Sequence, residues 1–183
     1  MSNTRQVLLC GLGGQGVVLA GALLGAAAFS QGLQVSGNSS YGSAARGGQC
    51  RAEVVLSDDP IAFPYVTKAD ILVALSQSAY AQYLGWTASP DGVVFYDPSD
   101  VQPAVSALQR HVAVPASENA EVALGSRLGA NIVMLAAVVA ATQVVSRDAL
   151  ARAVTEGSPS RFRDLNERAV DLGFALGSNL HFP

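Results

Sequence analysis

Residues Val7–Gly25 read VLLCGLGGQGVVLAGALLG, and this stretch decides the fold. An aliphatic run typical of a buried strand leads into a glycine-rich turn. An Ala- and Leu-rich segment, Gly16–Ser30, follows and is typical of a close-packed helix. The turn, Gly11–Gly16, matches G-x-G-x-x-G between a strand and a helix, the context in which such loops hold anionic ligands.

Each glycine of this turn has an expected role. Gly11 permits the tight turn, Gly13 lets a ligand approach the backbone, and Gly16 lets the helix pack close to the sheet. A Cβ at Gly14 would stand where a phosphate approaches, and the helix N-terminus adds free N–H groups and partial positive charge. The alternative is a tight strand-to-helix turn without a ligand.

Strands and helices alternate along most of the chain, which predicts an α/β fold in three layers. We expect a mainly parallel sheet of about six strands, helices on both faces, a helical C-terminal third, and a single domain over residues 1–183. Beyond the first strand, strands are expected at Leu33–Ser36, Gln49–Ser57, Ala69–Leu75, 93–97 and His111–Pro115. Helices are expected at Gln77–Leu84, Ala120–Leu124, Asn131–Val145, Ser146–Thr155 and from Ser158 onward, with a loop at Gly37–Gly48.

Two patterns predict exposed side chains. The alternation in Gln49–Ser57 gives one wetter face with Arg51, Glu53 and Ser57, and the last helix presents Asn166, Glu167 and Arg168 outward.

Composition excludes several classes of protein. Half of the residues are hydrophobic and 14% are charged, which excludes a disordered chain. The net charge is −3 and Lys68 is the only lysine, which argues against a nucleic-acid partner. The apolar stretch Val7–Phe29 is broken by glycines and Gln15, and Ile132–Val145 is short, so we expect no membrane span and a cytoplasmic protein.

The few metal-binding residue types argue against a metal or cluster. Cys10 and Cys50 form no C-x-x-C, and two thiols cannot hold an iron–sulfur cluster alone. We expect free buried thiols, with a disulfide as the alternative, and no ligand pair from His111 and His181.

A redox dinucleotide is disfavoured. An NAD site needs an acid at the end of the second strand, and Val35–Asn38 contains none. No Tyr is followed four residues later by Lys, and G-x-x-x-x-G-K is absent, which excludes short-chain dehydrogenases and P-loop nucleotidases.

A second loop lies in Ser40–Ile61, SYGSAARGGQCRAEVVLSDDPI. The pair Gly47 and Gly48 lets the chain turn back into the third strand and places Arg46 near the first glycine loop. Arg46 is therefore the best candidate for a phosphate clamp, with a surface arginine as the alternative.

Five ordered motifs resemble one known family: GLGGQGVVLAGALLG, YGSAARGG, SDDPIAFP, ADILVALSQSAY and LGANIVMLAAVVAAT. Between Val7 and Leu176 the chain is similar to the gamma subunit of 2-oxoacid:ferredoxin oxidoreductases of the 2-oxoglutarate and pyruvate/ketoisovalerate type. That family converts a 2-oxoacid and coenzyme A to acyl-CoA and carbon dioxide and passes two electrons to ferredoxin.

The resemblance implies a division of labour. This sequence has no thiamine-binding motif and no cluster cysteines, so thiamine diphosphate, Mg and the iron–sulfur clusters belong on alpha and beta partner subunits. A ferredoxin-like delta subunit is a further candidate partner. The gamma part is associated with coenzyme A, which implies binding residues at Gly11, Gly13, Gly14, Gln15, Gly16, Ser43, Arg46, Gly47 and Asn131.

The sequence leaves open the role of Asn131 and the affinity for coenzyme A. Asn131 begins an apolar helix, so a structural N-cap is an alternative to a ligand contact. Ala44 and Ala45 stand where some relatives have basic residues, which implies modest affinity for coenzyme A or charge from other subunits. The competing functions are an NAD(P)-binding enzyme and a purely structural scaffold subunit.

Overall fold

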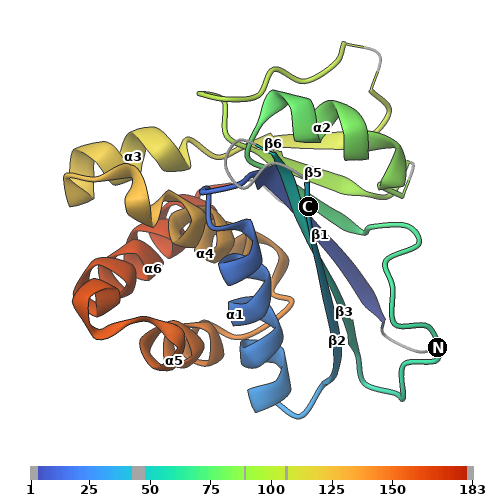
Figure 1. Cartoon of the computed structure of the whole chain (residues 1–183), viewed down its shortest axis with the longest axis horizontal. Helices are drawn as coiled ribbons and strands as arrows, with labels where there is room; N and C mark the ends of the chain where they lie inside the picture. The colour runs from blue at the N-terminus through green and yellow to red at the C-terminus, as the bar shows by residue number, and fades with distance from the viewer. Residues whose placement is uncertain (1–3, 43–47, 89, 106, 181–183) are drawn as a thin grey trace.

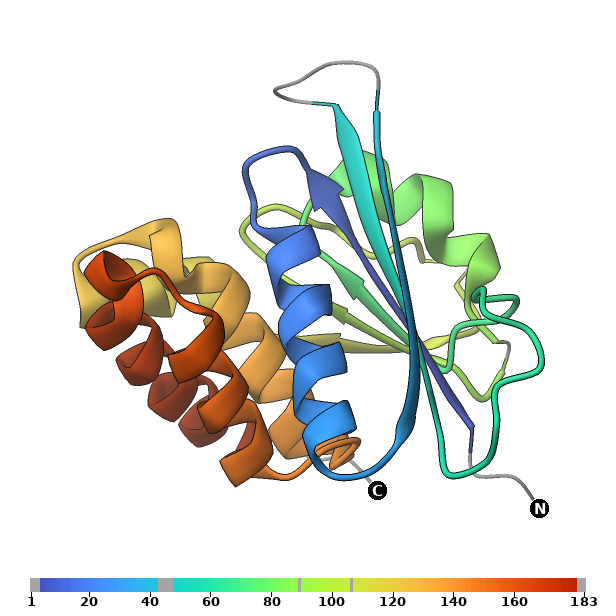
Figure 2. The ribbon, with the colours of Figure 1, turned by 60° about the horizontal axis from the view of Figure 1, so that its bottom comes forward.

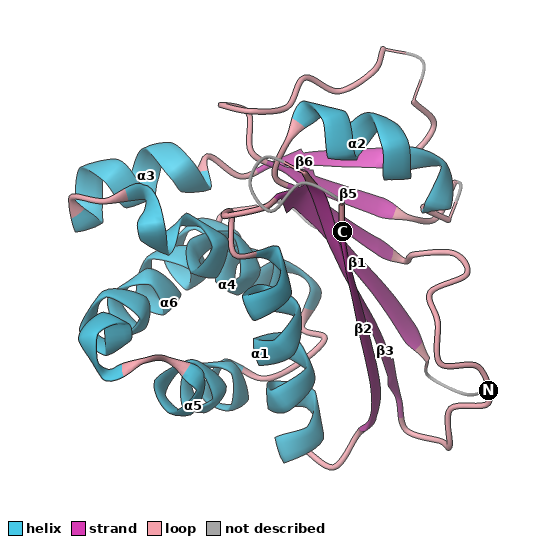
Figure 3. Cartoon of the chain, viewed as in Figure 1, coloured by secondary structure: helices cyan, strands magenta, loops and turns pink. Residues whose placement is uncertain are grey.

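The computed structural model describes residues 4–42, 48–88, 90–105 and 107–180. The first two thirds of the chain contain six strands, with one helix after β1 and another after β4, and the last third is helical (Figures 1 and 3). The strands are β1 (Arg5–Leu12), β2 (Gln34–Tyr41), β3 (Gln49–Ser57), β4 (Ile71–Ala74), β5 (Val93–Tyr96) and β6 (Arg110–Ala113). The helices are α1 (Val17–Ser30), α2 (Gln77–Tyr83), α3 (Ala116–Leu124), α4 (Ala130–Thr142), α5 (Arg147–Gly157) and α6 (Arg163–Ser178), with 3₁₀ turns η1 (Leu84–Trp86), η2 (Arg127–Gly129) and η3 (Ser160–Phe162).

The strands form one sheet in the order β2-β3-β1-β4-β5-β6. β1, β4, β5 and β6 are parallel, whereas β3 runs antiparallel to both β1 and β2. The predicted α/β class with a mainly parallel sheet is confirmed. β3 separates β2 from β1, so the first three strands do not form the consecutive parallel unit of a dinucleotide-binding fold.

β2 is longer than predicted. A strand was expected only over Leu33–Ser36, with a Gly- and Ser-rich loop from Gly37, but β2 continues to Tyr41. Each residue from Gly37 to Tyr41 is paired with β3, from Val54 back to Cys50. The ladder to β3 therefore overrides the low strand propensity of this sequence.

The two faces of the sheet are covered unequally. The helices α1 and α3–α6 lie on one side and α2 lies on the other, as Figure 2 shows. The side chains of β1 alternate between two cores: Val7 and Leu9 join the α1 and α4 side, and Leu8 and Cys10 join the α2 side. Burial on both faces explains why β1 reads as a continuous apolar run.

The central helix of the large layer is α4. Its residues from Asn131 to Val139 are all buried, which confirms the buried helix predicted for this segment. The helix ends at Thr142, before the predicted Val145, because Gln143 adopts a left-handed backbone with φ of 54°. Ser146 then caps α5 by accepting a hydrogen bond from the Ala149 amide, as the sequence indicated.

The wetter face predicted for β3 is wrong at Glu53 and Ser57, which are 5% and 2% exposed. The segment between β3 and β4 covers that face, and the Val66 amide donates to Glu53 Oε2 at 3.1 Å. A buried carboxylate is tolerated here because Arg51 Nε also donates to Oε1 at 2.9 Å.

Within the described residues, no helix is both long and apolar enough to cross a bilayer. The single-domain organisation of residues 1–183 stays a prediction.

Candidate functional site

The glycine loop between β1 and α1 is held by Gln15. Its Oε1 accepts from the Leu12 amide at 2.6 Å, and its Nε2 donates to the Leu75 carbonyl at 2.7 Å. A Cβ on Gly11 would lie 2.6 Å from this Oε1. Gly11 therefore leaves room for the Gln15 side chain, and Gln15 ties the loop to the end of β4.

Only part of the loop backbone is free to bind a ligand. The Gly13 amide donates to the Gly48 carbonyl at 2.8 Å, so this N–H is already used. The amides of Gly14 and Gly16 make no hydrogen bond to another described group, and the first turn of α1 has neither a side-chain cap nor an acid. The partial positive charge at the N-terminus of α1 therefore faces the space in front of these amides, where it would attract an anion.

Gly14 borders that space. Its φ is +100°, and nothing lies within 4 Å of a Cβ built on it. The backbone at Gly14 thus has open space in front of it, and the approach of a ligand there stays a prediction. The positive φ also means that any side chain at Gly14 carries backbone strain of its own.

Asn131 joins this loop from α4. Its Nδ2 donates to the Gly16 carbonyl at 3.2 Å. The N-cap of α4 is Gly129, with no side-chain cap, so the alternative of Asn131 as an N-cap is wrong. A Cβ on Gly16 would collide with the Asn131 amide, so the glycine gives close contact with α4 and not, as predicted, with the sheet.

A cavity of about 840 Å³ opens in front of these groups. It lies between the glycine loop, the ends of β4 and β5, and the helices α3, α4 and α6. The side chains and backbone around it belong to Gly14, Gln15, Gly16, Leu19, Leu75, Asp97, Asp100, Ser117, Glu121, Gly125, Ser126, Arg127, Leu128, Ala130, Asn131, Pro159, Phe162, Leu165 and Asn166. The sequence prediction included only the glycine loop and Asn131 from this set.

The acids of the cavity have different roles. Asp97 is buried and accepts from the amides of Ser99 (3.0 Å) and Ser117 (2.7 Å), so it fixes the start of α3. Asp100 lies 3.9 Å from Arg127 in a loose, exposed ion pair. Such a pair contributes about 0–1 kcal/mol, so the Arg127 guanidinium can exchange this partner for a ligand.

Arg127 is the only cation among the described residues that line the cavity. It was missed because it lies in the short connection between α3 and α4, which carries no recognisable motif. Its position four residues before Asn131 was the only available signal.

Asn166 forms the floor of the cavity and corrects an expectation. Predicted to be exposed, it is 6% exposed and donates from Nδ2 to Ser158 Oγ at 2.8 Å. The η3 turn directs the start of α6 back toward α4, which rotates Asn166 inward.

Three predicted site residues, Ser43, Arg46 and Gly47, lie outside the described residues. Their described neighbours are close to the site: the Gly48 carbonyl bonds to Gly13, and the Gly42 amide donates to the Gln49 carbonyl at 2.6 Å.

Cys10 and Cys50 are free and buried, as predicted. They belong to the two different cores and therefore face opposite sides of the sheet. Burial raises the pKa of the Cys10 thiol to about 12 and also raises the pKa of Cys50. Over the described part of the chain, no group of three His, Cys, Asp or Glu residues is placed to hold a metal.

The raised pKa of Cys10 leads to a testable prediction. At pH 8 we expect iodoacetamide to alkylate Cys10 in the folded chain at least about a thousandfold more slowly than in the urea-unfolded chain, because only the thiolate reacts. Peptide mass spectrometry over time measures both rates. Equal rates would show that Cys10 is accessible.

Comparison with known proteins agrees with this architecture. Residues 6–176 match the family described as pyruvate ferredoxin/flavodoxin oxidoreductase. The 2-oxoglutarate synthase subunit KorC of Methanocaldococcus jannaschii is 37% identical over 181 residues, which is 96% of this chain and 95% of KorC.

Two solved structures share the fold. The gamma subunit of a keto/oxoacid ferredoxin oxidoreductase from Geobacter sulfurreducens PCA has a TM-score of 0.85 at 34% identity, over 96% of this chain and 97% of that chain. A 2-oxoglutarate:ferredoxin oxidoreductase from Magnetococcus marinus, with 2-oxoglutarate, coenzyme A and succinyl-CoA bound, has a TM-score of 0.87 at 21% identity. The match covers 98% of this chain but only 32% of that longer chain.

The family match and the full-length relatives place the chain among the α/β subunits of 2-oxoacid oxidoreductases. The chain belongs to the pyruvate ferredoxin/flavodoxin oxidoreductase family, as a gamma-type subunit of a 2-oxoacid:ferredoxin oxidoreductase.

Proposed function

We propose that this subunit binds coenzyme A in the cavity in front of α1, for an enzyme that oxidatively decarboxylates 2-oxoglutarate in the cytoplasm. The observation that carries the proposal is the set of unpaired amides at Gly14, Gly16 and the first turn of α1, which open into a cavity of about 840 Å³. Cavities of about 300–1,000 Å³ are usual for small-molecule sites. The full-length similarity to KorC supports the choice of 2-oxoacid.

The residues of this chain have separable roles in that binding. The amides of Gly14 and Gly16 receive a phosphate, Asn131 holds the Gly16 carbonyl and offers its Oδ1 to the ligand, and Arg127 supplies charge. The apolar side chains of Leu128, Phe162 and Leu165 cover the less polar part of the ligand.

The redox chemistry belongs to other chains. On alpha and beta partner subunits, thiamine diphosphate with Mg would supply the decarboxylation chemistry, and iron–sulfur clusters there or on a ferredoxin-like delta subunit would pass the electrons to ferredoxin. The two cysteines here face opposite sides of the sheet and fit no cluster. The contribution of this chain is to hold coenzyme A.

A nicotinamide dinucleotide fits less well. β3 lies between β1 and β2, and β2 carries no acid. The strand that would supply a ribose-binding carboxylate is therefore displaced from the glycine loop.

The test is a calorimetric titration of coenzyme A into the assembled enzyme, with NADH as the competing ligand. We expect Arg46→Ala and Arg127→Ala each to weaken coenzyme A binding about 10- to 150-fold, since a charge-assisted hydrogen bond contributes about 1.5–3 kcal/mol. Arg46→Lys and Arg127→Lys should recover only part of the loss.

The matched control is Arg152→Ala, because Arg152 is exposed on α5 and does not line the cavity. Binding of NADH in place of coenzyme A, or a wild-type enzyme that binds neither ligand, would refute the proposal. The second result would leave the scaffold function.

A further inference from the structure

A stretch of 40 residues near the start of the chain, residues 6–45, carries no charge. Between Arg5 and Arg46 there is no Asp, Glu, Lys or Arg, although 14% of the whole chain is charged. This stretch forms β1, which is buried, and α1 and β2, which both reach the surface. An uncharged surface of this extent distinguishes α1 and β2 from the rest of the molecule.

The outer side of α1 is apolar. One helical stripe of it holds the exposed Ala22, Ala26 and Phe29 and the half-buried Val18 and Gly25. Phe29 is 74% exposed. A helix that is apolar on all sides belongs in a protein interior, yet the partners of α1 within this chain cover only its inner side.

The neighbouring strand is an unprotected edge. β2 is the outermost strand of the sheet, is eight residues long, and contains neither a charge nor a proline. Natural edge strands usually carry such residues because a bare edge pairs with other chains. A groove of about 250 Å³ separates β2 from α1, between Ala22 and Gly25 on the helix and Gly37 and Ser39 on the strand.

An aromatic pair lies across the edge from α1. Phe63 and Tyr65 are 57% and 49% exposed, with ring centroids 5.5 Å apart. The Pro64 carbonyl between them accepts from Ser36 Oγ at 2.8 Å and from Asn38 Nδ2 at 2.9 Å.

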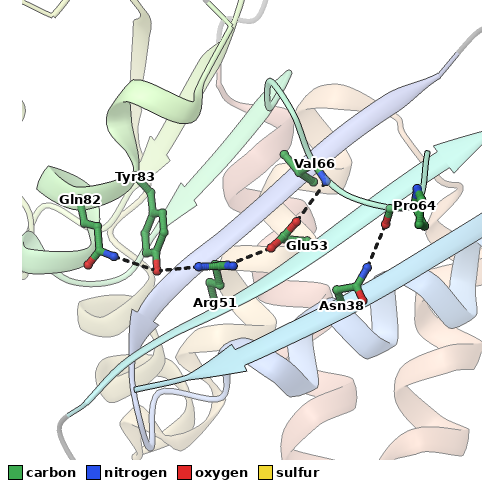
Figure 4. Close-up of polar contacts among 7 residues, drawn as sticks. All are labelled: Asn38, Arg51, Glu53, Pro64, Val66, Gln82 and Tyr83. Atoms are coloured by element: carbon green, nitrogen blue, oxygen red, sulfur yellow. Dashed lines mark hydrogen bonds and ion pairs between the residues drawn. The ribbon is translucent and has the colours of Figure 1, made fainter. Parts of the chain in front are cut away.

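The buried Glu53, the partner of Asn38 on β3, holds the same segment two residues further on. It accepts from the Val66 amide and from Arg51 (Figure 4). The Arg51 guanidinium also stacks on Trp86, with its Cζ 5.1 Å from the ring centroid. The backbone that carries the two exposed rings is thus held in place in the isolated chain. Aromatic side chains held rigidly in this way are the usual anchors of protein interfaces.

We propose that this surface, the α1–β2 face (residues 18–41 with Phe63 and Tyr65), docks the chain onto a partner subunit of the oxidoreductase through an uncharged, apolar surface of that subunit. In the Magnetococcus structure the same fold is 32% of a longer chain, so a covalently joined body of about twice its size accompanies the domain there. A subunit that is a separate chain must instead bind the corresponding partner subunit through non-covalent contacts of its surface. A charged partner does not fit, because its charges would lose water against this face without gaining a counterion.

The test uses Ala22→Lys, which adds a charge at the centre of the face. Ala22 is exposed and does not line the cavity, so the isolated chain should keep its circular dichroism spectrum and melting temperature. The affinity of the chain for the remaining subunits, measured by biolayer interferometry, should fall about 100-fold or more. Ala175→Lys, at an exposed alanine of α6, is the matched control and should assemble like the wild type.

Hydrogen exchange of the assembled enzyme is the second measurement. Amides of residues 17–41 should exchange at least about tenfold more slowly in the complex than in the isolated chain. Unchanged exchange there, or normal assembly of Ala22→Lys, would overturn the proposal. A dimer of the isolated chain that Ala22→Lys dissociates would also overturn it, since the face would then join two copies. Docking does not require coenzyme A binding, so loss of one proposal leaves the other standing.

Discussion

Gly173→Ala is expected to destabilise the isolated chain by about 2–3 kcal/mol, although alanine favours helices. Gly173 lies where α6 crosses α4, and a Cβ there would collide with the Val133 carbonyl and lie 2.5 Å from Ala136 Cβ. The helices must separate to admit it, at the cost of packing along both. Urea denaturation measures the loss, and the melting temperature should fall by about 4–12 °C.

Gly25→Ala is the control with the opposite expected sign. Gly25 is also in the middle of a helix, but a Cβ there meets only Val35 at an ordinary 3.4 Å. Alanine loses less conformational entropy on folding than glycine does, so this variant should be more stable by about 0.5–1 kcal/mol. If both variants behaved alike, the close contact of α4 with α6 would not be what limits stability.

The packing of α4 against α6 matters for the site because α4 carries Asn131. Gly177 repeats the arrangement one turn further on, where a Cβ would lie 2.6 Å from that of Ala140. Two glycines spaced four apart thus let α6 lie directly on α4. This close contact fixes the position of α4 and therefore the place where Asn131 contacts the glycine loop.

Local sequence patterns predicted the elements that local interactions determine. The strand, turn and helix of residues 5–30, the buried α4 and the Ser146 cap all follow from spacing and residue type. The predicted second strand ended too early because the pairing of β2 with β3 is a non-local interaction, and it overcomes the preference of Gly37–Ser40 for a loop.

The site was only half predicted for a similar reason. The glycine loop is recognisable from its sequence pattern. The opposite wall of the cavity is formed by single residues of α3, η2 and α6, which belong to no motif. Gln15 was expected to bind the ligand, but its Oε1 accepts from the Leu12 amide and its Nε2 donates to the Leu75 carbonyl. Its role is to shape the loop whose amides remain free.

Gly16→Ala is expected to weaken both the fold and the ligand site. Its φ of +72° costs an alanine about 1–2 kcal/mol, and the added Cβ collides with the Asn131 amide. Asn131 must then rotate and lose its hydrogen bond to the Gly16 carbonyl. We expect a total loss of about 2–4 kcal/mol in urea denaturation, and coenzyme A affinity about 100-fold weaker in the folded fraction.

A double-mutant cycle with Asn131→Ala separates the two causes. Asn131→Ala alone removes one hydrogen bond, for about 1 kcal/mol, and opens the space that the Cβ of Ala at position 16 needs. The double variant should therefore be more stable than the sum of the single losses by about 1–2 kcal/mol, since the collision is absent and the shared hydrogen bond is lost once instead of twice. Coenzyme A binding should not recover with the stability, because the double variant lacks the Asn131 amide at the ligand. Additive losses of stability would mean that Gly16 and Asn131 do not form one unit, and recovered binding would remove Asn131 from the site.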